Sequence, residues 1–430
     1  METNQPKKKR SLLPLWILIG MFAGILVGLM CLWLPGWVNH PEWKEPMVNF
    51  TTNWLKPIGD IYINLLKFLI VPVVLISITA GVISLGDLKK VGSIGIKTFL
   101  YYLCTTAIAV IIGLVIVNLF KGLFPALPGA NLTELEYQAK EAPKVMDVIK
   151  GIFPDNALKP LVNADMLPVI CVAIFLGAGI LAVGKKAEPI TNLVNAANEV
   201  VIQILMMIIK VTPIGVFCLM ANVVAVNGPM IIGSLALVIG VAYLAYLAHI
   251  IVVYGLSVQL LSRMNPFKFF RGMMPAMITA FTTTSSNATL PVNLECCTEL
   301  GADKGVTSFV LPLGATINMD GTAIYQAVAA VFIACCYGMN LTFGQMAQIV
   351  LTAVLASIGT AGVAGAGPIM LAMVLAQIGV PVEGIALIIG VDKIFDMGRT
   401  TLNITGDATC AIWVSRLEQR KAARKAAKQA

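Results

Sequence analysis

The 430-residue sequence contains little charge. Asp, Glu, Lys and Arg together make up 12% of it, whereas hydrophobic residues make up 58%. Soluble domains carry about 25% charged residues, so this chain cannot cover a water-exposed surface in the usual way. Its mean hydropathy of +0.86 points in the same direction. We therefore exclude a soluble globular domain and expect an integral membrane protein.

Histidine and paired cysteine are also scarce. His40 and His249 are the only histidines, and none of the nine cysteines belongs to a CxxC pair. Most of the cysteines lie within apolar runs, where cysteine behaves as a small hydrophobe. These shortages argue against a zinc site and against histidine acid–base chemistry. We expect neither an enzyme nor an organic cofactor.

The net charge of +8 does not indicate nucleic acid binding, because the basic residues flank apolar segments. One cluster, 7–10, precedes the first apolar segment, and a second, within 416–430, follows the last. Basic clusters at the ends of membrane spans mark the cytoplasmic side. We expect cytoplasmic termini (1–11 and 416–430), a multi-pass position in the cell (inner) membrane, contact with the lipid bilayer and no nucleic acid partner.

Long apolar segments occupy the first 262 residues: 12–36, 57–86, 92–124, 160–183, 200–226 and 230–262. About 20 apolar residues span the hydrocarbon core as a helix. Lysine and arginine gather at alternate connections, which places those connections on the cytoplasmic side. Because both termini are basic, we expect an even number of crossings. The fold class expected is an all-α polytopic membrane protein.

Beyond Arg271 the apolar segments are interrupted by polar residues. A hairpin is expected over 272–306 and another over 345–380, each followed by a polar helix, 307–337 and 384–414. Non-helical backbone at membrane depth is tolerated only where protein or a water-filled cavity satisfies it. Matching interrupted segments in two halves are typical of inverted-repeat transporters. Two re-entrant hairpins add no crossing, so we expect eight transmembrane helices.

The last polar helix carries its ionisable groups on one face. At about 100° per residue, one stripe contains all five of Asp392, Asp396, Arg399, Asn403 and Asp407. A charge at the bilayer centre costs about 2.5 kcal/mol or more, so these groups need partners. Because the acids exceed the base, we expect a cationic ligand to complete the balance.

Two clusters indicate what the ligands are. The planar fork of Arg399 suits a carboxylate and Asp396 suits an ammonium, which together match a zwitterion with an extra carboxylate. The interruption at Asn318–Thr322 offers amide, carboxylate, hydroxyl and free backbone oxygens, a set that suits a hard cation such as sodium. Three hydroxyl residues in 92–124 could join it or could be ordinary packing residues: Tyr102, Thr105 and Thr106.

These motifs resemble the dicarboxylate/amino acid:cation symporter family, which includes archaeal aspartate and mammalian excitatory glutamate transporters. The resemblance rests on four runs in order and register: Ser285–Pro291, Asn318–Thr322, Gly362–Gly367 and Asp396–Thr400, the last continuing to Asn403 and Asp407. It extends from Lys56 to about Ser415.

The resemblance implies a homotrimer working as an elevator-type transporter. Scaffold helices would lie in 12–91 and 125–229, and the mobile transport domain would comprise 92–124 and 230–415. The second hairpin would be the outer gate, and the cargo would be glutamate or aspartate with sodium ions.

The resemblance also implies roles for individual residues. In substrate binding, Arg399 and Thr322 would hold the side-chain carboxylate and Asp396 the ammonium. The implied substrate set is Thr284, Ser285, Ser286, Thr322, Val363, Gly367, Asp396, Arg399, Thr400 and Asn403. The implied sodium set is Tyr102, Thr105, Thr106, Gly314, Thr316, Asn318, Asp320, Ser357, Ile358, Thr360, Asn403 and Asp407.

The sequence departs from the family pattern at several positions. Relatives place an arginine at the first hairpin tip or beside the eighth-helix aspartate, where this chain has Thr284 and Met397. Ala364 replaces a hairpin proline, and Gln326 replaces a glutamate of mammalian relatives, which predicts no potassium counter-transport. Proton coupling and a C4-dicarboxylate cargo stay open as alternatives. An intramembrane aspartyl protease would leave Arg399 and the hairpins unexplained, and an anion channel would need a continuous basic pore, whereas the sequence shows one intramembrane base.

Overall fold

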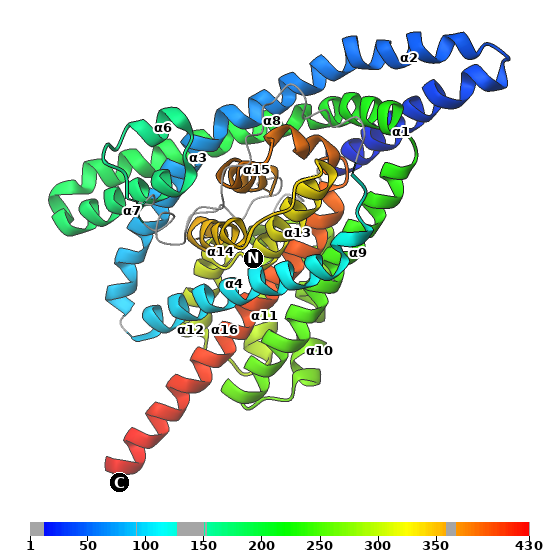
Figure 1. The fold of residues 1–430 in the computed structure, drawn as a ribbon. Helices are drawn as coiled ribbons and strands as arrows, with labels where there is room; N and C mark the ends of the chain where they lie inside the picture. The colour runs from blue at the N-terminus through cyan, green and yellow to red at the C-terminus, as the bar shows by residue number, and fades with distance from the viewer. Residues whose placement is uncertain (1–12, 92, 127–149, 151–152, 358–366, 430) are drawn as a thin grey trace, which may run out of the picture.

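The computed structural model describes residues 13–91, 93–126, 150, 153–357 and 367–429 (Figure 1). All regular secondary structure within these ranges is helical. Six helical stretches are long and apolar enough to cross a membrane: Leu15–Trp37, Pro41–Ile83, Ile94–Leu123, Leu167–Lys210, Met230–Leu261 and Lys304–Cys336. The all-helical, polytopic membrane class is confirmed, whereas the count of eight crossings stays a prediction.

One layer of the molecule is built from long apolar helices. It contains α1 (Leu13–Trp37), α3 (Lys56–Val91), α7 (Met166–Val183) and α8 (Glu188–Asn227). α8 packs on both α1 and α3, and α3 also packs on α7 (Figure 1). Short elements connect these helices: η1 (Pro41–Trp43), α2 (Lys44–Phe50), the π-helical η2 (Thr51–Leu55), α6 (Lys159–Asn163) and η5 (Gly184–Ala187).

Glycines allow α1 to approach α8 closely. A Cβ at Gly24 would lie 2.5 Å from the carbonyl oxygen of Phe217, and one at Gly20 would lie 2.4 Å from that of Pro213. Small residues at such contacts are typical of helix pairs in membranes, where close packing replaces the hydrophobic driving force. The α1–α8 contact is therefore specified by shape.

A second group of helices surrounds the polar segments. α4 (Ser93–Phe120, continued by η3, Lys121–Leu123) and α9 (Met230–His249) both pack on α13. α9 continues as two π-helical turns, η6 (Ile250–Gly255) and η7 (Ser257–Leu261). The span expected at 230–262 is thus present, but its last part, from Ile250 to Leu261, is largely π-helical.

The first hairpin consists of α10 (Pro266–Thr283) and α11 (Ser286–Glu299). It begins earlier than the expected residue 272, because Asn265 caps α10 by accepting from the backbone N–H of Phe267 at 2.8 Å, with Pro266 in the first turn. The following helix likewise begins before 307, because Asp303 caps it. Asn265 and Asp303 are recognisable as helix caps in the sequence, but the apolar pattern alone does not identify them.

The interruption expected at Asn318–Thr322 is present. α12 (Lys304–Ile317) and α13 (Asp320–Cys336) are separated at Asn318 and Met319, whose backbones leave the helical conformation. The second hairpin comprises α14 (Phe343–Ser357) and α15 (Gly367–Ile378), and its connection, 358–366, lies outside the described residues.

The last helix differs from the expected 384–414 at both ends. Residues Val382–Leu387 form the 3₁₀ helix η8, and α16 begins at Asp392 and runs to Gln429. The beginning at Asp392 places a carboxylate in the first turn, where the helix dipole favours it. The expected basic tail, 416–430, largely continues the helix, since alanine, lysine, arginine, glutamate and glutamine are strong helix formers.

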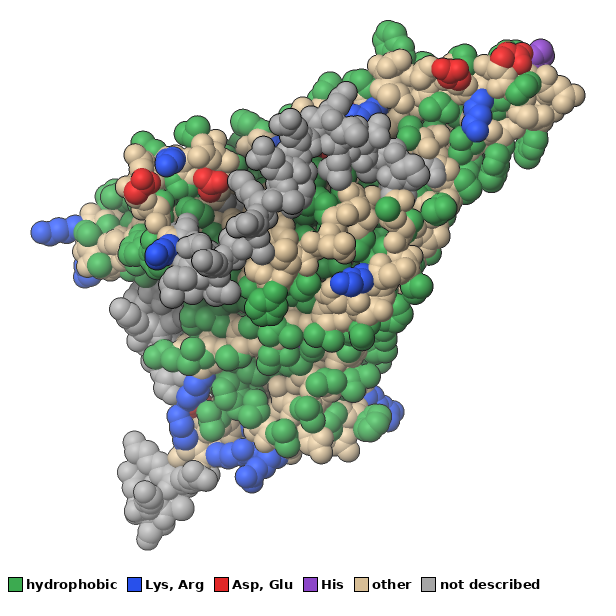
Figure 2. Space-filling view, viewed as in Figure 1, with side chains coloured by type: hydrophobic (Ala, Val, Ile, Leu, Met, Phe, Trp, Pro, Cys, Tyr) green, Lys and Arg blue, Asp and Glu red, His purple; other side chains and the backbone are tan. Residues whose placement is uncertain are grey.

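The described surface is largely apolar. In the space-filling view, hydrophobic side chains cover a broad band of the molecule, and Lys and Arg gather at the end from which α16 projects (Figure 2). Large side chains such as Trp16, Phe22 and Phe68 are exposed on α1 and α3. Such a surface is suited to lipid or to other apolar protein surfaces.

Candidate functional site

The polar stripe of α16 lies inside the protein. The exposed fractions of its five residues are between 1% and 8%: Asp392 8%, Asp396 4%, Arg399 3%, Asn403 4% and Asp407 1%. α16 reaches this position because it packs on α10, α12 and α13. The helical periodicity thus places five polar groups on one buried face.

Arg399 is held by two aspartates and one aromatic ring. Its Nε and Nη2 donate to Asp396 Oδ1 at 3.1 and 2.7 Å, and its Nη1 lies 3.5 Å from Asp392 Oδ1. The guanidinium carbon is 4.8 Å from the centre of the Tyr325 ring, within cation–π range. Nη1 has no hydrogen-bond partner among the described residues. The Nη1 corner of the Arg399 guanidinium can therefore donate to a further acceptor.

Glycines on neighbouring elements bring backbone close to Arg399. A Cβ on Gly367, at the start of α15, would lie 1.9 Å from Arg399 Nη1. A Cβ on Gly321, in the first turn of α13, would lie 2.3 Å from the Arg399 carbonyl oxygen. The free corner of the guanidinium therefore faces the second hairpin, and these two positions leave no room for a side chain.

A second buried carboxylate, Asp320, accepts hydrogen bonds from three helices. Thr106 of α4 donates to its Oδ1 at 2.6 Å, and Tyr254 of η6 donates to its Oδ2 at 2.7 Å. His249 Nε2 lies 3.2 Å from the same Oδ2, and both side chains are fully buried. Asp320 is thereby fixed at the point where α4, α9 and α13 meet.

The third buried carboxylate, Asp407, lies beside the interruption between α12 and α13. Asn318 Nδ2 donates to Asp407 Oδ1 and to the Asn403 carbonyl oxygen, both at 2.9 Å. A Cβ on Gly314 would lie 2.4 Å from Asp407 Oδ1 and 2.6 Å from Tyr102 Oη. Five residues of the predicted sodium set therefore meet here.

This cluster has an excess of acceptors. Asn318 Oδ1 is buried without a hydrogen-bond partner in the described part of the chain. Within the same ranges, no Lys or Arg forms an ion pair with Asp320 or Asp407. An unpaired buried carbonyl oxygen is costly unless a donor or a cation binds there.

The remaining predicted residues are distributed as follows. Thr400 donates to Asp396 at 3.4 Å, and Thr322 is 6% exposed beside Met319. Thr284 and Ser286 are buried at the first hairpin tip, and Ser285 caps α11. Thr105 bonds only its own helix among the described contacts.

Four residues of the predicted sodium set, Thr316, Ser357, Ile358 and Thr360, are described only in part. Thr316 is exposed on this chain, Ser357 is buried and donates to the Val354 carbonyl oxygen at 2.7 Å, and the side chains do not meet in any contact that the structure describes. Ile358 and Thr360 lie outside the described residues, as does Val363 of the predicted substrate set. The structure therefore leaves this set as a prediction.

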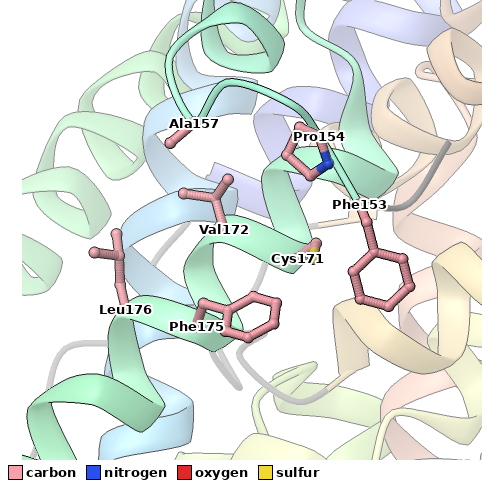
Figure 3. Close-up of a pocket in the computed structure, with 7 residues that line it drawn as sticks. All are labelled: Phe153, Pro154, Ala157, Cys171, Val172, Phe175 and Leu176. Carbon is pink, nitrogen blue, oxygen red and sulfur yellow. The ribbon is translucent and has the colours of Figure 1, made fainter. Parts of the chain in front are cut away.

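An apolar cavity of about 320 Å³ lies elsewhere, between α7 and the segment before it (Figure 3). Phe153 and Pro154 line it from the connecting segment, and Cys171 and Phe175 line it from α7 (Figure 3). No predicted substrate or sodium residue lines it. The buried charges therefore mark the site better than this hollow does.

Sequence reasoning missed three residues of the site. Lys393, in the first turn of α16, donates to Thr284 Oγ1 and lies 3.5 Å from Asp396 Oδ2. His249 and Tyr254 bind Asp320. Lys393 could have been found from its i,i+3 spacing to Asp396, whereas His249 and Tyr254 lie in apolar runs that give no periodic signal.

Fold and site together define a polytopic helical membrane protein with ionisable groups enclosed in its interior. The family described as the sodium:dicarboxylate symporter family matches residues 13–417, and the chain belongs to this family. Its members are transporters and not enzymes.

Curated relatives match over almost their whole length. The proton/sodium-glutamate symport protein of Bacillus subtilis (strain 168) is 33% identical over 94% of this chain and 92% of its own. The proton/glutamate-aspartate symporter of Escherichia coli (strain K12) is 32% identical over 94% and 92%. The C4-dicarboxylate transport protein 1 of Bradyrhizobium diazoefficiens is 34% identical over 93% and 88%.

Proposed function

We propose that this chain is a secondary active symporter that takes up glutamate or aspartate together with sodium. The observation that carries the proposal is the buried pair of Arg399 and Asp396, joined at 2.7 Å. A cation for the side-chain carboxylate and an anion for the α-ammonium lie side by side, and this arrangement is complementary to an acidic amino acid.

The free corner of Arg399 gives the substrate its first contact. Nη1 has no hydrogen-bond partner in the described ranges and lies against Gly367, so a carboxylate binds there once the second hairpin has moved away from α16. Thr322 assists at this carboxylate, and Asp396 with Thr400 receives the ammonium. Asn403 and Ser286 bind the α-carboxylate, with Thr284 and Ser285 beside them and Val363 closing over the substrate.

Sodium binds where oxygen ligands exceed donors. Asn318 Oδ1, Asp407 and the backbone near Gly314 and Asn403 supply one site. Asp320, Thr106, Thr105 and Tyr102 supply a neighbouring site that shares Asn318. Oxygen ligands of this kind suit a hard monovalent cation. A further sodium uses backbone carbonyls from Thr316, Ser357, Ile358 and Thr360.

Transport proceeds by an elevator mechanism in a homotrimer. The layer of α1, α3, α7 and α8 forms the scaffold, and α4, α9 and the segments from α10 to α16 move together as the transport domain. Strong packing within each group supports this division. The protein lies in the cell (inner) membrane with both termini in the cytoplasm, an orientation supported by the basic end from which α16 projects.

Uptake of labelled aspartate and glutamate into proteoliposomes, with sodium, proton and potassium gradients imposed separately, tests this function. We expect accumulation with inward sodium and no requirement for internal potassium. Uptake driven by protons without sodium would show that the proton is the coupling ion, and the proposed substrate would still hold. No uptake or binding of either amino acid under any gradient would overturn the proposal.

A C4-dicarboxylate cargo is the second candidate, because one similar protein is named as a C4-dicarboxylate transport protein. Asp396 argues against it, since a dicarboxylate has no ammonium to bind this carboxylate. Competition by succinate against labelled aspartate separates the two. Weak competition by succinate supports the amino acid, and stronger competition than by unlabelled aspartate supports the dicarboxylate.

A further inference from the structure

Lys393 is a cation beside the substrate site that neither the family motifs nor the stripe of α16 includes. Its Nζ donates to Thr284 Oγ1 at the first hairpin tip and lies 3.5 Å from Asp396 Oδ2. Its side chain is 12% exposed, so the ammonium is largely withdrawn from solvent. One lysine thus connects the first hairpin with the carboxylate assigned to the substrate ammonium.

The position of Lys393 is unfavourable without a local reason. It lies in the first turn of α16, where the helix dipole disfavours a positive charge. Asp392 and Asp396 offset this effect. Thr284 is in the left-handed conformation, with φ of 51°, and its hydroxyl donates to the Thr283 carbonyl oxygen at 2.7 Å. The Thr284 oxygen can then accept from Lys393, and these contacts hold a conformation that threonine rarely adopts.

The two oxygens of Asp396 have different partners. Oδ1 accepts from Arg399 Nε and Nη2 and from Thr400. Among the described residues, Oδ2 faces Lys393 alone. An ammonium that binds Asp396 therefore approaches Oδ2 and meets the charge of Lys393 there.

We propose that Lys393 is an internal competitor of the substrate ammonium at Asp396. With the substrate absent it bridges Thr284 and Asp396, and when an α-ammonium arrives it gives up Asp396 and keeps its bond to Thr284. With a dicarboxylate that lacks an amino group, Lys393 stays at Asp396 and keeps that carboxylate neutralised. Lys393 is thus a specificity-determining residue, an inference that rests on the proposed binding of acidic amino acids.

The test compares two ligands that differ by one ammonium. Binding of aspartate and of succinate to the purified full-length protein is measured by titration calorimetry at fixed sodium, for wild type, Lys393→Met and Lys393→Arg. The Lys393→Met change should tighten aspartate binding about two- to fivefold, the scale of one partly exposed ion pair. It should weaken succinate binding by a similar factor, and Lys393→Arg should restore the wild-type ratio.

The matched control removes a lysine of similar burial outside the site. Lys97 pairs with Glu418 and is 21% exposed, so Lys97→Met should leave the ratio of the two affinities unchanged. A change of both ligands in the same direction, or no change in either, would overturn the role of Lys393. A merely structural lysine would move both together.

A double-mutant cycle tests the link to the hairpin. Thr284→Ala removes the acceptor and leaves Lys393 on Asp396, so aspartate binding should weaken about two- to fivefold. In the Lys393→Met background the same change should have little further effect on the ratio, whereas full additivity would overturn the link. If wild type binds succinate but not aspartate, the proposed substrate fails independently of these variants.

Discussion

The layer of α1, α3 and α8 and the core of α12, α13 and α16 are buried by different chemistry. In the most apolar 18-residue window of each helix, 22% of residues are buried in Leu15–Trp37 and 94% in Lys304–Cys336. The layer makes contact through glycines and apolar side chains. The core encloses carboxylates, a guanidinium and amides, which in an apolar interior need partners. The arrangement of helices in the layer therefore depends on the fit of their surfaces, and that in the core depends on the pairing of buried charges.

The largest expected effect comes from breaking that charge balance. Arg399→Cys leaves Asp392 and Asp396 buried without their guanidinium, a loss of about 3–5 kcal/mol, or at least about 100-fold in affinity. We expect uptake of glutamate and aspartate to fall by this factor and the preference to shift toward neutral amino acids. Competition for uptake in proteoliposomes measures it.

Arg420→Cys is the control for this change. Arg420 lies on the same helix and donates to the Ser262 carbonyl oxygen at 3.3 Å, away from the buried stripe. Its replacement should leave the substrate preference as in wild type. An Arg399→Cys protein that still prefers acidic amino acids would contradict the charge assignment of the core.

A smaller effect of a different kind is expected in the layer. At Gly24→Ala the new Cβ would lie 2.5 Å from the Phe217 carbonyl oxygen, so α1 must shift away from α8. Overpacking of this kind costs about 1–3 kcal/mol. We expect a lower melting temperature of the purified protein with an unchanged ratio of aspartate to succinate affinity.

Gly233→Ala in α9 is the matched control, because its Cβ would meet nothing within 4 Å. Alanine favours a helix over glycine by about 1 kcal/mol, so this variant should melt no lower than wild type. If Gly24→Ala instead changed the substrate preference, it would be wrong that close packing in the layer affects stability alone and that the charges of the core determine substrate preference.

The core could be predicted from sequence to the extent that polar residues interrupt apolar patterns. The stripe from Asp392 to Asp407 follows from helical periodicity, and the break at Asn318 follows from a polar run within an apolar segment. The beginning of α16 at Asp392 could not be read in this way, because hydrophobicity continues through the 3₁₀ segment before it.

Partners from other helices were beyond the reach of sequence patterns. His249 and Tyr254 each stand alone in an apolar run, and only packing of α9 and η6 against α13 brings them to Asp320. In the layer, the sequence predicted long apolar helices but not their pairing. Close approaches such as Gly24 to Phe217 depend on crossing geometry, which composition does not encode.

Within the core, Tyr254→Phe sharpens the comparison by removing one hydrogen bond and no charge. The loss leaves Asp320 Oδ2 with His249, at a cost of about 1 kcal/mol or about fivefold. On the proposed coupling, the sodium concentration for half-maximal aspartate uptake should rise by that factor. Sodium titration of uptake measures it.

Tyr246→Phe is the control, because the Tyr246 hydroxyl is buried without a hydrogen-bond partner in the ranges that the structure describes. Its removal should leave the sodium dependence unchanged. Equal shifts in both variants would mean that the ring environment, and not the bond to Asp320, sets the sodium response.

The smallest expected effect concerns an ion pair near the surface, between α4 and the outer part of α16. Lys97 of α4 donates to Glu418 of α16 at 2.6 Å, and this bond lowers the pKa of the Glu418 carboxyl. Because the pKa is lower in the folded protein, the stabilisation is present above the ordinary value of 4.5 and is lost as the pH falls through the lowered pKa. Glu418→Gln should therefore reduce the unfolding free energy by about 0.2–1 kcal/mol at neutral pH and by progressively less toward pH about 3.

Melting curves of wild type and variant across this pH range measure the difference. The control is Glu295→Gln, at an exposed position that forms no ion pair with any described residue, and it should show no difference. A deficit that is constant with pH would show that Glu418 acts by packing and not by its charge.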